Sequence, residues 1–177
     1  MTTLIQKYPM DEKITSLISH FDLEEHPEGG YFKETYRSEG VIPEAVFPDI
    51  FEGSRNYCTG IYFLLTSDTF SAFHKIRQDE MWHFYQGSPL TIHMISTDGN
   101  YSKQVVGLNF DNGELPQFTV PKEYWFAAEV NEPNSYSFVG CTASPGFDFR
   151  DFELAEKERL SSQFPQHKNI ISRLTRD

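Results

Sequence analysis

Eight short segments of strand type follow one another between residues 59 and 144, and they constrain the fold more than any other feature. β-Branched and aromatic residues are frequent in them, and glycine, proline or asparagine separates them. Asp98-Gly99 and Asn112-Gly113 are dipeptides typical of hairpin turns. The segments are "TGIYFLL", "SAFHKI", "MWHFYQ", "LTIHMIS", "YSKQVVGL", "PQFTVP", "YWFAAEV" and "SYSFVGCTAS". This pattern predicts an all-β sandwich or barrel.

The two ends of the chain have a different pattern. Four apolar residues near the N-terminus recur at helical spacing: Ile14, Leu17, Ile18 and Phe21. The turn "HPEGG" ends that helix, "YFKETYRS" alternates like a strand, and "EGVIPEAVFPDIFEGS" is typical of a long loop. The charged tail "FELAEKERLSSQF" favours helix. We therefore expect one domain, with an N-terminal helix and turn over 1–30, a barrel over 31–152 and a helical tail over 153–177.

Charge and cysteine content limit the partners and the compartment. The formal net charge of −11 argues against non-specific binding to nucleic acid or to anionic membranes, which requires a basic surface. Cys58 and Cys141 are too few for a disulfide framework. No apolar run approaches the ~18 residues of a membrane span, and no apolar leader precedes the first helix. These features predict a soluble, cytoplasmic protein.

The stretch "SAFHKIRQDEMWHFYQG" contains the strongest candidate for a functional site. If its two strand segments pair as antiparallel neighbours, His74 and Glu80 could meet inside the barrel. Period-2 alternation places Trp82 and Phe84 on the same face as Glu80. A concave, mostly apolar pocket with a few convergent polar groups is the usual form of a small-ligand site.

The same residues resemble the first motif of the cupin superfamily, H-x-H-x3-E-x6-G, at His74, Glu80 and Gly87. Pro121 begins the second motif, P-x-G-x2-H. Five blocks in order resemble the uncharacterised cupin subfamily once called domain of unknown function 985: "HPEGGYFKETYRS", "GIYFLL", "DEMWHFYQGSPL", "VPKEYWFAA" and "VGCTASPGFDFRDFEL". The resemblance implies a cupin jelly-roll barrel. It also implies a homodimer in which N-terminal strands pack across the interface.

The sequence departs from the superfamily at the metal ligands. Metal-binding cupins supply three histidines and one glutamate. In this chain Ile76 and Phe126 stand at two histidine positions, and Glu123 replaces the glycine of the second motif. We therefore expect no metal cofactor.

A metal-dependent cupin oxygenase or isomerase stays an alternative. Its site would keep His74 and Glu80 as ligands, with His93 or Gln117 as a possible third. Two protein ligands are fewer than catalytic zinc and facial-triad iron sites use.

Metal-free members of the superfamily suggest a different chemistry. The deoxysugar-nucleotide 3,5-epimerases use a histidine held by an acid as the base and a tyrosine as the opposing acid. By this resemblance His74 would be the base, Glu80 or Asp79 its orienting partner, and Tyr62 or Tyr124 the acid. The structural alternative is that His74 and Glu80 form a buried hydrogen-bonded pair with no catalytic role.

The segment "FKETYRS" offers further ligand contacts. Arg37 suits a phosphate or a carboxylate, Tyr36 could stack on a base or sugar, and Glu34 shares a face with Tyr36. An edge strand whose charges pair across a dimer interface explains the same residues. The remaining candidate contacts are Trp82, Phe84, His93, Gln117 and Phe126.

We expect a small polar ligand that is sugar- or nucleotide-like, and the sharpest hypothesis is a sugar-nucleotide epimerase or isomerase. A non-catalytic binding or storage module is the alternative.

Overall fold

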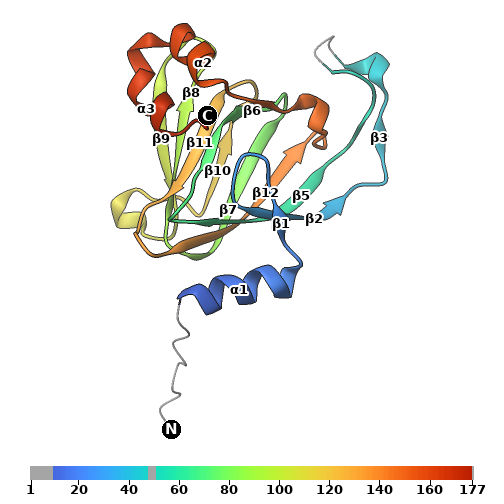
Figure 1. The fold of residues 1–177 in the computed structure, drawn as a ribbon. Helices are drawn as coiled ribbons and strands as arrows, with labels where there is room; N and C mark the ends of the chain where they lie inside the picture. Colours follow the sequence, from blue (N-terminus) through green and yellow to red (C-terminus); the bar gives the residue numbers. More distant parts are fainter. Residues whose placement is uncertain (1–9, 48–50, 177) are drawn as a thin grey trace.

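The computed structural model describes residues 10–47 and 51–176. Two antiparallel β-sheets lie face to face, and short helices flank them at the two ends of the chain (Figure 1). No helix in these two ranges is long and apolar enough to cross a membrane.

The larger sheet has six strands. In spatial order they are β1 (Glu24–Glu25), β2 (Tyr31–Arg37), β5 (Thr59–Thr66), β12 (Tyr136–Ser144), β7 (Asp79–Gly87) and β10 (Gln117–Val120). The second sheet has five strands: β13 (Glu153–Leu154), β6 (Ser71–Lys75), β11 (Trp125–Val130), β8 (Leu90–Ile95) and β9 (Tyr101–Val106). A small ribbon pairs β3 (Val41–Ile42) with β4 (Arg55–Asn56).

Helical elements connect and cover the sheets. The α-helices are α1 (Met10–Phe21), α2 (Lys157–Gln163) and α3 (Lys168–Arg173). The single-turn 3₁₀ helices are η1 (Glu44–Val46), η2 (Phe110–Asn112), η3 (Phe149–Asp151) and η4 (Pro165–His167).

Strand alternation divides the apolar residues among three clusters. The central cluster lies between the sheets and contains Phe63, Trp82, Ile92, Phe126 and Val139. On the outer face of the five-stranded sheet, α2 and α3 cover a second cluster. On the outer face of the six-stranded sheet, α1 covers a third. Each sheet is therefore covered on its outer face as well as on its inner face over part of its area. The site lies in the inner layer, between the two sheets.

The expected all-β jelly-roll fold is confirmed. Each of the eight predicted segments forms a strand, from β5 to β12. Helices form on both sides of the strand region, as the end patterns predicted. The two sheets do not close into one continuous barrel. The expected loop from Glu39 to Ser54 contains β3 and η1, and its residues 48–50 lie outside the described part of the chain.

One pairing considered from the sequence does not occur. If β6 and β7 were antiparallel neighbours, His74 and Glu80 could meet, but β6 pairs with β11 and β13, while β7 pairs with β12 and β10. The connection between them crosses from one sheet to the other. His74 and Glu80 nevertheless line the same space, because each points inward from its own sheet.

Candidate functional site

A cavity of about 290 Å³ lies between the two sheets. Phenylalanine and isoleucine side chains line part of its walls, and histidine and glutamate side chains gather within it. The lining residues are His26, Glu28, Phe32, Glu34, Arg37, Thr59, Ile61, Phe63, His74, Ile76, Glu80, Cys141, Ala143, Phe147, Asp148, Phe149 and Phe152.

Four of these residues form an acid–base cluster: His26, Glu28, His74 and Glu80. The turn between β1 and β2 supplies His26 and Glu28, β6 supplies His74, and β7 supplies Glu80. Both sheets and one turn thus meet at a single point. His74 is 2% exposed and Glu28 is 6% exposed. The accessible part of Glu80 borders the cavity.

Glu28 lies at the centre of the hydrogen bonds in this cluster. Its Oε2 is 3.1 Å from His74 Nε2 and 3.4 Å from His26 Nδ1. The hydroxyl of Ser71 donates to Glu28 Oε1 at 2.8 Å. The two histidines are therefore bridged by one carboxyl group.

The contacts of His74 fix where its proton lies. His74 Nδ1 is 2.7 Å from the carbonyl oxygen of Ala72, and because a carbonyl only accepts, Nδ1 carries a proton. In the neutral ring Nε2 is then bare and faces Glu28 Oε2. Two lone pairs do not face each other at 3.1 Å, so a proton lies between these atoms. Glu28 and His74 share it.

Burial favours the uncharged form of each group in the cluster. It raises the pKa of Glu28 and lowers the pKa of His26 and of His74. Burial and the charge of Glu28 raise the pKa of Glu80 to about 7, against the opposing effect of His74. Near neutral pH the two histidines are thus neutral, and Glu80 is close to its titration midpoint.

Arg37 lies at the edge of the cavity with every donor occupied. Its Nε and Nη2 donate to the two carboxylate oxygens of Glu34, at 2.9 and 2.7 Å. Both Nη atoms donate to the carbonyl oxygen of Phe147 at 3.1 Å, and Nη1 also donates to Asn56 Oδ1. A guanidinium has five N–H donors, and these five contacts use all of them.

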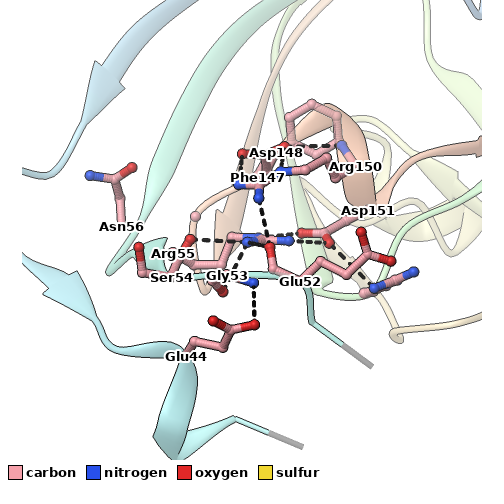
Figure 2. A network of polar contacts seen from close by, with 12 residues as sticks. Glu44, Glu52, Gly53, Ser54, Arg55, Asn56, Phe147, Asp148, Arg150 and Asp151 are labelled. Atoms are coloured by element: carbon pink, nitrogen blue, oxygen red, sulfur yellow. Dashed lines mark hydrogen bonds and ion pairs between the residues drawn. The ribbon is translucent and has the colours of Figure 1, made fainter. Parts of the chain in front are cut away.

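The segment 145–152 forms one wall of the cavity, and a buried ion pair holds it in place. Figure 2 shows Arg55 between Asp151 and the backbone of residues 52–54. Arg55 Nε and Nη2 donate to the two oxygens of Asp151 at 2.7 and 2.6 Å. Gln78 Nε2 donates to Asp151 Oδ2 at 2.6 Å. This network fixes the chain beside Phe147, Phe149 and Phe152.

Of the residues predicted from the sequence, the structure brings four to the cavity: Glu34, Arg37, His74 and Glu80. The partner of His74 differs from the expectation. Glu28, not Glu80 or Asp79, lies within hydrogen-bonding distance of His74 Nε2.

Three predicted aromatic residues lie in the core beside the cavity. The ring of Phe126 packs on the ring of His74 at 4.1 Å between centroids. Trp82 is fully buried between Phe63 and Phe126. Phe84 packs against the same cluster. They support the shape of the site, and they do not line it.

The two candidate tyrosines do not line the cavity. Tyr62 points away from it, because Ile61 and Phe63 on either side point inward along β5. The ring of Tyr62 packs on Phe21 of α1 at 5.0 Å. Tyr124 packs against the central cluster.

The remaining three candidates also lie elsewhere. Tyr36 is 56% exposed, on β2. His93 contacts Tyr101 at 2.7 Å and Glu129 at 2.9 Å. Gln117 is exposed and donates to the sulfur of Met81. None of the three is among the described residues that line the cavity.

Sequence reasoning missed His26 and Glu28, which lie in the turn "HPEGG". Gly29 has φ +110°, and a Cβ there would lie 2.3 Å from the carbonyl oxygen of Phe70. The backbone N–H of Ala72 donates to the carbonyl oxygen of Glu28 at 2.8 Å. The turn is therefore pressed against β6, which brings both side chains to His74. The glycine pair in this turn was the sequence signal for a tight turn, but nothing in the spacing of residues along the chain places that turn beside His74.

The donor groups around His74 do not fit a metal centre. Ile76 and Phe126 occupy the positions of two cupin histidine ligands. His74 Nδ1 is bonded to Ala72 and Nε2 to Glu28, so neither ring nitrogen is free. Within residues 10–47 and 51–176, no group of three or more histidine, cysteine, aspartate or glutamate side chains is placed to hold a metal ion.

Comparison with known families agrees with this architecture. The family model described as "Cupin superfamily (DUF985)" matches residues 15–155. The chain belongs to this cupin family. The match begins within α1 and spans both sheets and every residue of the acid–base cluster.

Individual relatives extend the similarity over most of the chain. This cupin is 35% identical to the uncharacterised protein YML079W of Saccharomyces cerevisiae over 167 residues, which cover 86% of this chain and 81% of the yeast protein. It resembles the crystal structure of protein SO0799 from Shewanella oneidensis, with a TM-score of 0.81 and 42% identity. The match covers 91% of this chain and 96% of the Shewanella chain. A hypothetical protein from Leishmania major has a TM-score of 0.84, 34% identity and coverage of 92% and 98%.

Proposed function

We propose that this cupin binds a small, uncharged, sugar-like molecule in its cavity and moves a proton on it, as an isomerase or epimerase does. The observation that carries the proposal is the acid–base cluster. One shared proton lies between Glu28 and His74, and the Glu80 carboxyl has a pKa of about 7 in the same enclosed space. A group whose pKa lies near the working pH is suited to general acid–base catalysis.

Cavity size supports a ligand no larger than a single sugar ring. Small-molecule sites commonly enclose ~300–1,000 Å³, and this cavity of about 290 Å³ lies at the lower end. The phenylalanine walls offer apolar faces to the C–H groups of a sugar, and the cluster offers hydrogen bonds to its hydroxyls.

The charges around the cavity disfavour a phosphate group. Arg37 is the one cationic side chain among the described residues that line it, and its donors are all occupied. Four carboxyl groups line the same space: Glu28, Glu34, Glu80 and Asp148. A nucleotide sugar would bring two phosphates to a site that has no free cation for them. A neutral sugar is therefore the better candidate than a sugar nucleotide.

The proposed chemistry needs no co-reactant. The ionised form of Glu80 takes a proton from the carbon next to a carbonyl group, and the proton shared by Glu28 and His74 passes to the carbonyl oxygen. The isomer forms when protonated Glu80 gives its proton to the neighbouring carbon while that enediol's other hydroxyl returns a proton to the Glu28–His74 pair. The epimer forms when one proton returns to the original carbon on its opposite face and the enol O–H proton returns to the pair. Apolar walls exclude water from the enediol intermediate.

The first experiment uses a panel of neutral aldoses and ketoses. Binding is detected by thermal shift, and each binder is then incubated with the protein in D₂O. We expect NMR to show solvent deuterium at the carbon next to the carbonyl. Glu80→Gln and His74→Asn should reduce the rate of incorporation at least a hundredfold.

His83→Asn is the matched control, because His83 lies on β7 with its ring on Thr142 and does not line the cavity. It should leave the incorporation rate within twofold of the wild-type rate. Unchanged incorporation in both Glu80→Gln and His74→Asn would contradict the catalytic proposal.

A non-catalytic binding module is the second candidate. It is favoured by the hydrogen bonds of His74, since both ring nitrogens have partners in the ligand-free protein. In that case the same two substitutions change the dissociation constant of a bound sugar, and no deuterium enters it.

A further inference from the structure

A second cavity, of about 360 Å³, lies behind the turn that carries His26 and Glu28. Its lining includes the charged residues Glu25, Asp68 and Arg176, and Glu25 and Asp68 are exposed to solvent. The other lining residues are His26, Pro27, Gly29, Gly30, Tyr31, Thr66 and Thr69. We call this space the rear cavity.

His26 is the residue that lines both the rear cavity and the site cavity. Its side chain is 8% exposed, and its Nδ1 lies 3.4 Å from Glu28 Oε2. The backbone N–H of Glu28 donates to the same Nδ1 at 3.3 Å, so Nδ1 accepts and the proton of the neutral ring is on Nε2.

A line of titratable groups therefore leads from the site to the rear cavity. It runs from His74 Nε2 to Glu28 Oε2 over 3.1 Å, and from Glu28 Oε2 to His26 Nδ1 over 3.4 Å. Apolar rings enclose His26 along this line: Phe32, Phe63, Phe149 and Phe152. Glu28 also lines the site cavity, and its side chain is 8% exposed, so the line through His26 is a second route that stays open when a ligand fills that cavity.

We propose that His26 is a relay residue through which the Glu28–His74 pair exchanges protons with water in the rear cavity. The inference rests on the proposed proton-transfer function, and it adds how the pair is reset between turnovers without opening the site cavity. A proton passes from Glu28 Oε2 to His26 Nδ1, displacing the 3.3 Å contact of the Glu28 N–H there, while the Nε2 proton of His26 passes to water. The ring ends in its other tautomer, and the reverse transfer, with a proton entering at Nε2, restores it.

The charges around His26 suit this role. Glu28 and His74 face it from the site, and Glu25, Asp68 and Arg176 lie on the side of the rear cavity. Arg176 donates to the carbonyl oxygens of Glu28 and Phe70 and to Thr69 Oγ1, so its position is fixed. Burial lowers the pKa of His26, which keeps the ring neutral and able to accept a proton at Nδ1.

The test measures proton exchange in the protein without any substrate. In protein labelled with ¹⁵N-histidine, NMR follows transfer of magnetisation from water to the proton shared by Glu28 and His74. His26→Gln keeps a polar side chain beside Glu28 but cannot pass a proton from one atom to another. We expect the exchange rate to fall at least tenfold, while His83→Gln, a control outside the line, leaves it unchanged.

Two further measurements separate a relay from a structural role. External imidazole at tens of millimolar should restore exchange in His26→Ala at least fivefold. Thr69→Trp leaves His26 in place but fills the rear cavity, and it should slow exchange severalfold. Exchange within twofold of wild type in both His26→Gln and Thr69→Trp would overturn the relay.

The relay and the proposed function can fail separately. Deuterium incorporation into a sugar with unchanged proton exchange in the His26 variants would overturn the relay and keep the isomerase. Slowed exchange in those variants would support the relay, even if every sugar tested is bound without turnover.

Discussion

Two clusters of buried ionisable groups lie close together in this protein, and they differ in how completely their charges are matched. Arg55 and Asp151 form a bidentate ion pair. Backbone carbonyl oxygens accept from Nη1 of Arg55, and Gln78 donates to Asp151. In the cluster of His26, Glu28, His74 and Glu80, there is no permanent cation, and neighbouring groups share protons.

The difference shows how a structural charge can be told from a functional one. The Arg55–Asp151 pair is fixed by two short hydrogen bonds, and it positions the wall segment 145–152. The acid–base cluster is held in an environment that penalises charge, so small changes of proton occupancy are accessible near neutral pH. The following predictions are ordered from the largest expected effect on stability to the smallest.

Breaking the ion pair should have the largest effect. Asp151→Asn leaves the buried guanidinium of Arg55 without a counter-charge, and we expect a loss of about 3–5 kcal/mol in the free energy of unfolding. Urea denaturation followed by fluorescence measures it.

The matched control for this substitution is Asp148→Asn, whose partner Arg150 is half exposed. Its loss should be about 1 kcal/mol or less. Equal losses in the two variants would contradict the distinction between the pairs.

The acid–base cluster should make stability depend on pH. The folded-state pKa of Glu80, about 7, is raised above its ordinary value of 4.5, so between these values the folded protein binds more protons than the unfolded chain. The contribution of Glu80 to stability therefore falls as the pH rises from about 4.5 to about 7. The full difference is at most about 3 kcal/mol.

Glu80→Gln removes this dependence. We expect the free energy of unfolding of the variant, minus that of the wild type, to be larger at pH 8 than at pH 4.5. Denaturation curves at several pH values measure both, and parallel pH profiles of the two proteins would show that Glu80 titrates normally.

The strand pattern of the sequence was enough to predict an all-β sandwich or barrel, because alternation and turn residues are local signals, and the cupin resemblance implied the jelly roll. The motif also pointed to His74 and Glu80, and both line the cavity between the sheets. Glu28 and His26 could not be predicted, because the turn at Gly29 and Gly30 approaches β6 through tertiary packing alone. We expected Tyr62 at the site because a tyrosine hydroxyl can act as a general acid. The face of the sheet on which its side chain lies depends on the register of β5 with its neighbours, which the sequence does not give. The homodimer implied by the family resemblance stays a prediction.

A smaller effect is expected at the edge of the cavity. Arg37→Met removes a partly exposed pair with Glu34, and we expect a loss of about 1 kcal/mol or less in the free energy of unfolding. Because Arg37 has no free donor, the wild-type protein and the variant should both show no thermal shift with sugar phosphates. A shift that occurs in the wild type alone would assign a phosphate contact to Arg37.

No effect is expected from metal ions. Protein purified without chelators should contain substoichiometric iron, manganese, nickel and zinc by elemental analysis. Added Mn²⁺ or Zn²⁺ should leave the melting temperature unchanged, since His74 has no free ring nitrogen. One bound ion per chain, lost in His74→Asn, would support the metal-dependent alternative instead.

The central claim is that the acid–base cluster exchanges protons near neutral pH, and the titration of Glu80 tests it most directly. In protein labelled with ¹³C at glutamate carboxyl groups, the resonance absent from Glu80→Gln is assigned to Glu80. We predict a titration midpoint near pH 7 for this resonance. A midpoint near the ordinary glutamate value of about 4.3 would contradict the account.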